Sequence, residues 1–248
     1  MNSPARLLAF LPAPLLCAVV LSANVTETVR ETYPLAANGS VRVENVNGRV
    51  VIEAWDRNEV SLVAEKSAPD ADDLQRMHVV VDAKPDVFAV KTEYDKQHLF
   101  SNNNRGEVSY HLKVPAGATL TNVSVVNSDI EVRGITTRVD LHTVNGKIEA
   151  TGLAAGGRFD TVNGSITVSF DHLAADVSLN TVNGSCRLRV PKDAGFDLRA
   201  SSLNGSTSCE LPVTLERSGH HQLRGVVGGG GPEVTMRSVN GSLAVKTL

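Results

Sequence analysis

The tetrapeptide Thr-Val-Asn-Gly occurs three times without change, at residues 143–146, 161–164 and 181–184. Near copies of its last three residues begin at residues 46, 126, 203 and 239. From Asn127 onward, the asparagines of successive copies are separated by 18, 18, 20, 21 and 36 positions. A nearly constant period of this kind indicates a repeat protein whose copies stack on one another. Because the last step is twice 18, we expect one copy near residue 222 to have lost its marker.

The residues that flank each Asn-Gly alternate between apolar and polar side chains. Ile166, Val168 and Phe170 follow Asn163 at every second position, with serine and threonine between them. A period of two with one apolar face is typical of a half-buried β-strand. Each copy is therefore predicted to contain a strand, a bend and a second strand, and the chain is predicted to be all-β.

Two architectures fit this pattern. Asn-Gly can close a two-residue antiparallel hairpin, or it can form the corner between two sheets of a β-solenoid whose copies stack about 4.8 Å apart. Both residues tolerate the left-handed backbone that such bends use. Identity at equivalent positions favours the solenoid, because stacked asparagines can form a ladder and valine can pack on valine. An antiparallel meander of hairpins is the alternative. The bend residues are Asn47, Gly48, Asn145, Gly146, Asn163, Gly164, Asn183, Gly184, Asn204, Gly205, Asn240 and Gly241.

The first 23 residues have the pattern of a secretory signal. Arg6 precedes a mostly apolar run from Leu7 to Val20, and small residues at Ser22 and Ala23 suit cleavage. We therefore divide the chain into a signal peptide (1–23), an N-terminal β region with the first copy (24–117) and the Val-Asn-Gly array (118–248). The protein is expected to be exported to the periplasm, the cell envelope or the medium. An uncleaved signal anchor would be its one link to a membrane.

Charge excludes one class of partner. Without residues 1–23, the chain has 23 basic and 27 acidic residues. A nucleic-acid-binding protein needs a basic face that neutralises phosphates, so no nucleic-acid partner is expected.

Two cysteines remain after cleavage. If copies stack in sequence order, Cys186 and Cys209 lie on adjacent rungs of the solenoid, offset by two residues. Their separation of about 7–8 Å is long for a disulfide, whereas an oxidising compartment favours one. A Cys186–Cys209 bond is therefore a candidate left open by the sequence.

Candidate catalytic and metal sites are weak. Stacking would align Ser124, His142 and Asp160 in one column, which is the composition of a hydrolytic triad. A flat strand face offers no oxyanion hole, so a polar surface column is the favoured interpretation. His220 and His221 are adjacent and point to opposite faces of an extended chain, so they make a poor metal site. No cofactor or metal is expected.

Three stretches carry a resemblance to a known family. They are residues 44–56 (ENVNGRVVIEAWD), residues 114–118 (VPAGA) and the glycine run 228–231. With these, the chain resembles the bacterial "putative adhesin" β-strand-repeat family, a domain of unknown function. The resemblance covers nearly all of the chain after the signal. It implies export, a β-solenoid-like fold and no described active site.

The sequence therefore predicts an exported, non-enzymatic surface protein that binds a protein, a glycan or another copy of itself. One alternative is a structural envelope protein that assembles through an uncovered strand edge near Leu248. The other is a β-helix carbohydrate-active enzyme, which would need two carboxylates facing each other in a groove.

Overall fold

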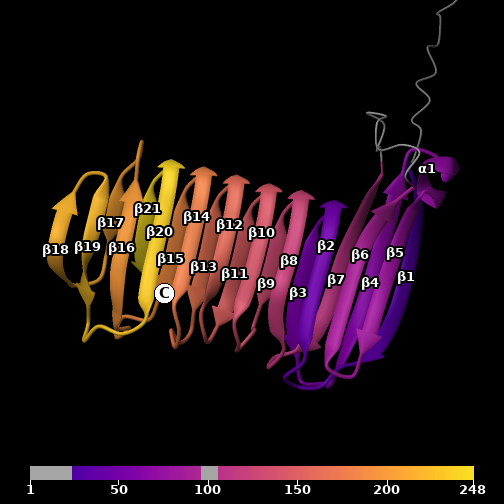
Figure 1. Ribbon diagram of the computed structural model, residues 1–248, viewed down its shortest axis with the longest axis horizontal. Helices are drawn as coiled ribbons and strands as arrows, with labels where there is room; N and C mark the ends of the chain where they lie inside the picture. The colour runs from indigo at the N-terminus through magenta and orange to yellow at the C-terminus, as the bar shows by residue number, and fades with distance from the viewer. Residues whose placement is uncertain (1–23, 96–105) are drawn as a thin grey trace, which may run out of the picture.

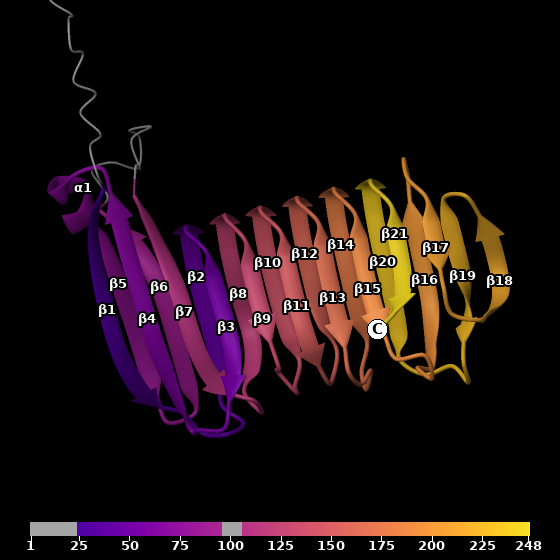
Figure 2. The same ribbon diagram turned by 180° about the vertical axis from the view of Figure 1, so that it is seen from behind.

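The computed structural model describes residues 24–95 and 106–248, so the predicted signal peptide lies outside the described residues. Two β-sheets form an elongated stack, one as the front layer and one as the back layer (Figures 1 and 2). The front sheet is ordered β18 (Val213–Gly219), β19 (Gln222–Val227), β16 (Phe196–Ser202), β20 (Glu233–Asn240), β14 (Val177–Asn183), β12 (Gly157–Asn163), β10 (Val139–Asn145), β8 (Thr119–Asn127), β2 (Ser40–Asn47), β6 (Val87–Tyr94) and β5 (Met77–Lys84). The back sheet is ordered β1 (Val25–Pro34), β4 (Glu59–Ala68), β7 (Glu107–Pro115), β3 (Val50–Trp55), β9 (Ile130–Arg133), β11 (Ile148–Leu153), β13 (Ile166–Phe170), β15 (Cys186–Val190), β21 (Leu243–Thr247) and β17 (Thr207–Cys209). The short helix α1 (Ala71–Gln75) is capped by the side chain of Asp70.

Strand pairing confirms the predicted solenoid. Each rung consists of a front strand, an Asn-Gly corner and a back strand, as in β10, Asn145-Gly146 and β11. In the front sheet, β10 pairs in parallel with both β8 and β12. In the back sheet, β11 pairs in parallel with both β9 and β13. A hairpin meander would have made these pairs antiparallel, so that alternative is wrong.

The rungs do not stack in sequence order at either end. The first Asn-Gly rung, β2–β3, lies between β6–β7 and β8–β9. The last rung, β20–β21, lies between β14–β15 and β16–β17. The first rung pairs directly with the array, and Asn47 is the register partner of Asn127. Both sheets therefore continue without a break from the N-terminal β region (24–117) into the array.

The expected copy without a marker near residue 222 does not exist. Strands β18 and β19 form a hairpin instead, and β19 pairs antiparallel with β16 at the end of the front sheet. The 36-residue step arises because this hairpin is inserted between two rungs.

The C-terminus lies inside the stack and not at its end (Figure 1). Strand β21 is paired on both sides, with β15 and β17. The prediction of an uncovered edge near Leu248 is therefore wrong. The outermost strands at this end are β18 in the front sheet and β17 in the back sheet.

The core lies between the two sheets and is built mainly of valine, leucine and isoleucine. Few aromatic side chains contribute; Phe159 and Phe170 meet edge to face, with ring centroids 6.4 Å apart. Alternating side chains of every rung face inward, as the period of two predicts. Among residues 24–95 and 106–248, no helix is long and apolar enough to cross a membrane.

Candidate interaction surface

The asparagines of the bends form one continuous hydrogen-bonded ladder along the edge of the stack. Each side-chain amide donates to the side-chain oxygen of the neighbouring rung, at 2.8–3.0 Å. The ladder confirms the stacking that the repeated marker predicted. In spatial order it consists of Asn47, Asn127, Asn145, Asn163, Asn183, Asn240 and Asn204.

The ladder leaves part of its hydrogen-bonding capacity for solvent or a ligand. A primary amide has two N–H donors and an oxygen with two lone pairs. An interior member such as Asn163 uses one donor toward Asn145 and one lone pair for Asn183. Because the side chains from Asn127 onward are exposed, the remaining donors and acceptors form a regular outward-facing row.

The marker glycines are explained by close stacking and not by a left-handed backbone. No described residue other than glycine has a positive φ, and among the marker glycines only Gly48 has one, at 107°. A Cβ on Gly184 would lie 1.8 Å from the carbonyl oxygen of Gly164, and Gly146, Gly164, Gly205 and Gly241 are equally crowded. The expectation that these glycines supply left-handed bends is therefore wrong for all but Gly48. Only a residue without a side chain lets successive corners approach this closely.

Inward-facing hydroxyl groups donate hydrogen bonds to the backbone carbonyl oxygens of the corners. The buried Thr161 donates to the carbonyl oxygen of Gly146 at 3.1 Å, and Thr181 donates to that of Gly164 at the same distance. Equivalent bonds come from Thr143, Ser238 and Ser202. Buried carbonyl groups need such partners, so in these five rungs the hydroxyl two places before the asparagine holds the corner in position.

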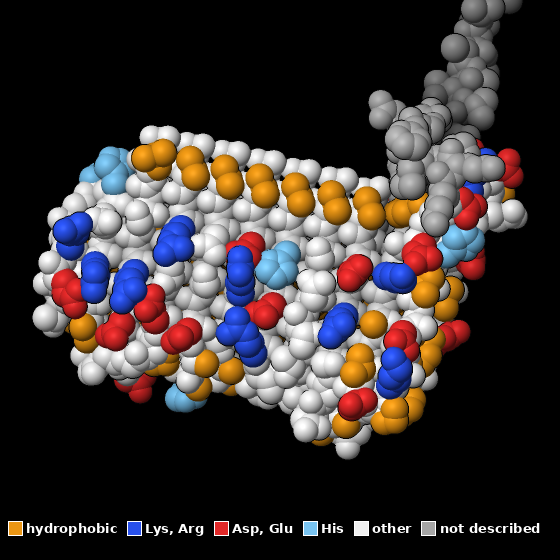
Figure 3. Space-filling view, viewed as in Figure 1, with side chains coloured by type: hydrophobic (Ala, Val, Ile, Leu, Met, Phe, Trp, Pro, Cys, Tyr) orange, Lys and Arg blue, Asp and Glu red, His pale blue; other side chains and the backbone are white. Residues whose placement is uncertain are grey.

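A row of exposed apolar side chains runs beside the ladder. These residues precede each asparagine and point outward, because the residue before each of them is buried and points inward. Val144, Val162 and Val182 remain about 40% exposed although each lies beside another valine, and Leu203 is 68% exposed. Figure 3 shows them as one straight row along the edge of the front face. In spatial order this apolar ridge consists of Val46, Val126, Val144, Val162, Val182, Val239 and Leu203. We call the asparagine ladder and the apolar ridge together the ladder strip.

The column Ser124, His142 and Asp160 stacks as predicted but does not form a triad. His142 Nδ1 lies 3.0 Å from Asp160 Oδ2, whereas no hydrogen bond joins Ser124 to His142 among the contacts of the described residues. Burial opposes ionisation of Asp160, but hydrogen bonds from His142, Asn180 and Arg158 outweigh it and lower the pKa to about 2. Asp160 is therefore the carboxylate of an ion-pair cluster on the outer face of the front sheet.

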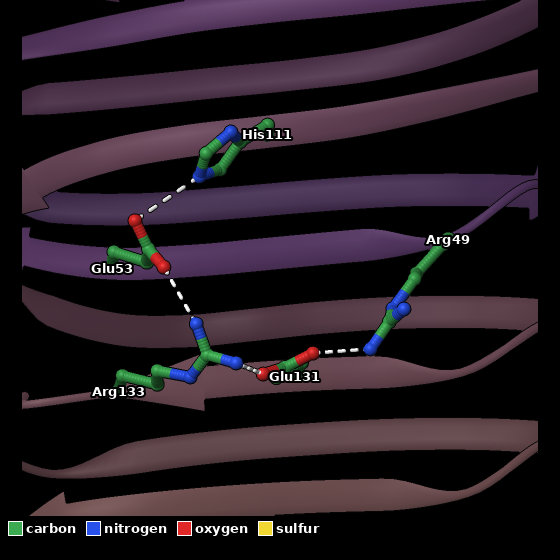
Figure 4. A network of polar contacts seen from close by, with 5 residues as sticks. All are labelled: Arg49, Glu53, His111, Glu131 and Arg133. Carbon is green, nitrogen blue, oxygen red and sulfur yellow. Dashed lines mark hydrogen bonds and ion pairs between the residues drawn. The ribbon is translucent and has the colours of Figure 1, made fainter.

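The back sheet carries a second charged network, drawn in Figure 4. Glu53 accepts from Arg133 at 2.7 Å and lies 3.2 Å from His111 Nε2. Arg133 and Arg49 both pair with Glu131. The hydrogen bond from His111, followed by that from Arg133, outweighs burial and lowers the pKa of Glu53. Because cations from neighbouring strands hold both carboxylates, the network ties β3, β7 and β9 together.

The cysteines do not lie on adjacent rungs, so that expectation is wrong. Cys186 is the register partner of Leu243, and Cys209 is the partner of Val245 on the other side of the same strand, β21. Both thiols are free, and burial raises the pKa of Cys186 to about 12. The candidate disulfide is replaced by two separate core thiols.

The adjacent histidines His220 and His221 contact each other. Their rings stack edge to face with centroids 4.8 Å apart, and no group of three metal-ligating side chains occurs within the part of the chain that the structure describes.

The sequence analysis did not predict the apolar ridge as a surface. Its signal was present in the sequence, because a residue next to an inward threonine in a strand must point outward.

Comparison with known proteins identifies a family that matches most of the chain. A family model described as Toastrack DUF4097 matches residues 29–246. No curated protein matches significantly. A solved "putative cell adhesion protein" from Clostridium sporogenes ATCC 15579 shares 12% identity at a TM-score of 0.45, over 91% of this chain and 100% of that one. A "putative adhesin" from Bacteroides fragilis NCTC 9343 shares 10% identity at a TM-score of 0.34, over 90% of this chain and 97% of that one. These likenesses are too distant to assign a ligand.

Proposed function

The chain belongs to the Toastrack DUF4097 family, and within it we propose an exported, non-enzymatic module of the cell envelope that binds a partner along the ladder strip. The signal-like residues 1–23 support export. The charged clusters support a non-enzymatic role, because their carboxylates are held in ion pairs.

The observation that carries this proposal is the continuity of the ladder strip. Seven rungs present the same two side chains, an asparagine amide and an aliphatic group, at a spacing of about 4.8 Å. In six of the seven rungs the apolar side chain stays 38–68% exposed, and Val46 in the seventh is half-buried; folding does not require an apolar side chain at so exposed a position. Exposed apolar side chains that line up over this length are typical of an interaction surface.

A straight repeating surface is complementary to a straight repeating partner. We assign the partner class as a linear envelope glycan, whose hydroxyl groups match the free amide groups and whose C–H faces match the valines. The strip contains no aromatic ring, so each contact is weak. Binding strength must then come from many contacts made at once, and it should rise steeply with glycan length.

The test is co-sedimentation of residues 24–248 with isolated, insoluble envelope glycan. The variant carries Val144→Thr, Val162→Thr and Val182→Thr together, which keeps the β-branched shape and places the new hydroxyls at exposed positions. Loss of three methyl contacts, each about 0.8 kcal/mol, predicts roughly 10- to 50-fold weaker binding. Val80→Thr on β5, equally exposed at 36% but outside the strip, is the matched control.

Unchanged binding by the triple variant, with the control also unchanged, would show that the strip is not the contact surface. Equal weakening by both variants would indicate a nonspecific apolar effect and would count against the proposal as well. Thermal unfolding of each variant verifies that the stack is intact.

Self-assembly is a second candidate, favoured by the outermost strand β18. Residues 214–219 are all exposed, and Leu215 is 52% exposed on this edge. Unpaired strand edges invite pairing with another chain. Light scattering across a concentration series tests this candidate: growth in mass that Leu215→Lys abolishes supports it, and a monomer at every concentration refutes it.

A further inference from the structure

Four arginines line one groove on the outer face of the front sheet, at the end formed by the β18–β19 hairpin. Figure 3 shows basic side chains gathered at this end. Arg217, Arg224, Arg199 and Arg237 come from the four neighbouring strands β18, β19, β16 and β20. Arg224 is the direct cross-strand partner of both Arg217 and Arg199. Like charges directly opposite each other in a sheet repel, so this arrangement does not serve sheet stability.

The nearby acids do not neutralise the cluster. Glu216 pairs with Arg224 at 2.7 Å, and Glu233 pairs with Arg199 at 3.2 Å. Arg217 donates to the neutral Gln222 at 3.2 Å, and Arg237 makes no hydrogen bond or ion pair with another residue that the structure describes. Arg217 and Arg237 therefore form no ion pair with a residue that the structure describes.

The arginines surround a groove of about 470 Å³. Its polar floor includes Ser201 and Gln222, which can donate hydrogen bonds to an anion. The hydroxyl of Thr235 also lines the groove but donates to Glu233 at 2.9 Å. The groove also borders the ladder strip, because Arg237 and Val239 are two residues apart on the same face of β20.

We propose that this arginine groove binds the acidic groups of a linear anionic glycan. A guanidinium group pairs with a carboxylate or phosphate through two parallel hydrogen bonds. Arginines on four adjacent strands span about 14 Å, which is too long for one small anion and suits several acidic groups along a chain. The inference rests on the proposed function for its partner class and adds the charge of that partner.

Other polyanions fit the surface less well. The groove has no aromatic side chain on which a nucleic-acid base could stack. An anionic membrane would face the whole front sheet, where the carboxylates of Asp140 and Asp160 are also exposed in part. A groove confined to one end suits a single chain that runs along the stack axis.

The experiment measures binding of residues 24–248 to polygalacturonate by titration calorimetry at low and physiological salt. Neutral dextran, inorganic phosphate and phosphatidylglycerol vesicles serve as comparison probes. The variant carries Arg224→Gln and Arg237→Gln. Arg42→Gln on β2, on the same face at the other end of the stack, is the matched control.

We expect salt-sensitive binding of polygalacturonate, roughly tenfold or more weakened in the double variant and unchanged in the control. Absence of binding, equal loss in the control, or tighter binding to vesicles or to phosphate alone would overturn the inference. The triple valine variant separates the two proposals. If it abolishes envelope-glycan binding while the arginine variant binds normally, only the groove inference fails; the reverse result removes the strip and keeps the groove.

Discussion

The side-chain amide of Asn240 donates a hydrogen bond of 2.8 Å to Asn183, although 57 positions separate the two asparagines in the chain. Asn204, which lies between them in sequence, is instead on the far side of Asn240 and donates to it at 2.9 Å. The last rung has thus been inserted between two earlier ones. This insertion places the C-terminal strand in the interior of the back sheet and leaves the β18–β19 hairpin at the end of the stack.

Rung order predicts which thiols can be joined. Cys186 and Leu243 are direct register partners, about 4.8 Å apart in neighbouring strands, which lies within the Cα range of disulfides. In a chain carrying Cys209→Ala and Leu243→Cys, mild oxidation should join Cys186 to the new thiol. Mass spectrometry of the unfolded protein should then detect the loss of two hydrogen atoms. The unaltered chain should keep both thiols free, and a Cys186–Cys209 bond in it would refute the insertion.

The glycine corner predicts a large difference between two chemically identical substitutions. Gly184→Ala places a Cβ 1.8 Å from a backbone oxygen that cannot move away freely. We expect it to lower the free energy of unfolding by about 3 kcal/mol, the upper end of the usual cost of overpacking. Gly229→Ala meets nothing within 4 Å, so its effect should stay within about 1 kcal/mol. Urea unfolding of both proteins measures the difference, and equal effects would contradict close stacking as the reason for the marker glycine.

Position in the ladder should set the cost of losing an asparagine. Asn163→Ala removes two side-chain hydrogen bonds, one to each neighbour, and Asn204→Ala removes only its bond to Asn240. For exposed amides we expect losses of about 1 kcal/mol and about 0.5 kcal/mol respectively. A larger loss at Asn204 than at Asn163, measured by urea unfolding, would show that the ladder does not act as a continuous unit.

The Asp160 cluster predicts how stability depends on pH. The pKa of Asp160 is lowered in the fold to about 2, so ionised Asp160 stabilises the protein above the ordinary aspartate pKa. That contribution disappears as the pH falls toward 2. After allowance for partial exposure, Asp160→Asn should cost about 1–2 kcal/mol at pH 6, and the cost should shrink between pH 4 and pH 2. Asp82→Asn, which breaks an exposed pair with Lys84, should cost a few tenths of a kcal/mol or less. A pH-independent cost for Asp160→Asn would show that its charge is not the cause.

Features that depend on local periodicity could be predicted from the sequence. The alternation around Ile166 and Val168 fixes which side chains face inward, and identical markers predict a solenoid with an asparagine ladder. The order of the rungs could not be predicted in this way. All copies carry nearly the same corner, so each corner fits beside any other, and only the complete set of contacts decides their order.

The candidate sites likewise include features that local sequence predicts and features that depend on contacts between rungs. The apolar ridge follows from the position of Val144 next to the inward Thr143, whereas the reason for Gly184 is a contact with Gly164 in another rung. The arginine groove exists because the β18–β19 hairpin folds back on β16 and brings Arg217 and Arg224 beside Arg199. No spacing in the sequence predicts that the hairpin pairs with β16.

The most direct test of the central claim is nuclear magnetic resonance of residues 24–248, labelled on side-chain amides and valine methyl groups, during titration with soluble envelope-glycan fragments. If the ladder strip is the binding surface, the shifts should concentrate on the amides of Asn145, Asn163 and Asn183 and on the methyl groups of the valines that precede them. They should grow with fragment length. Shifts confined to the back-sheet network around Glu53 and Glu131, or to the β18 edge, with the strip unchanged, would contradict the account.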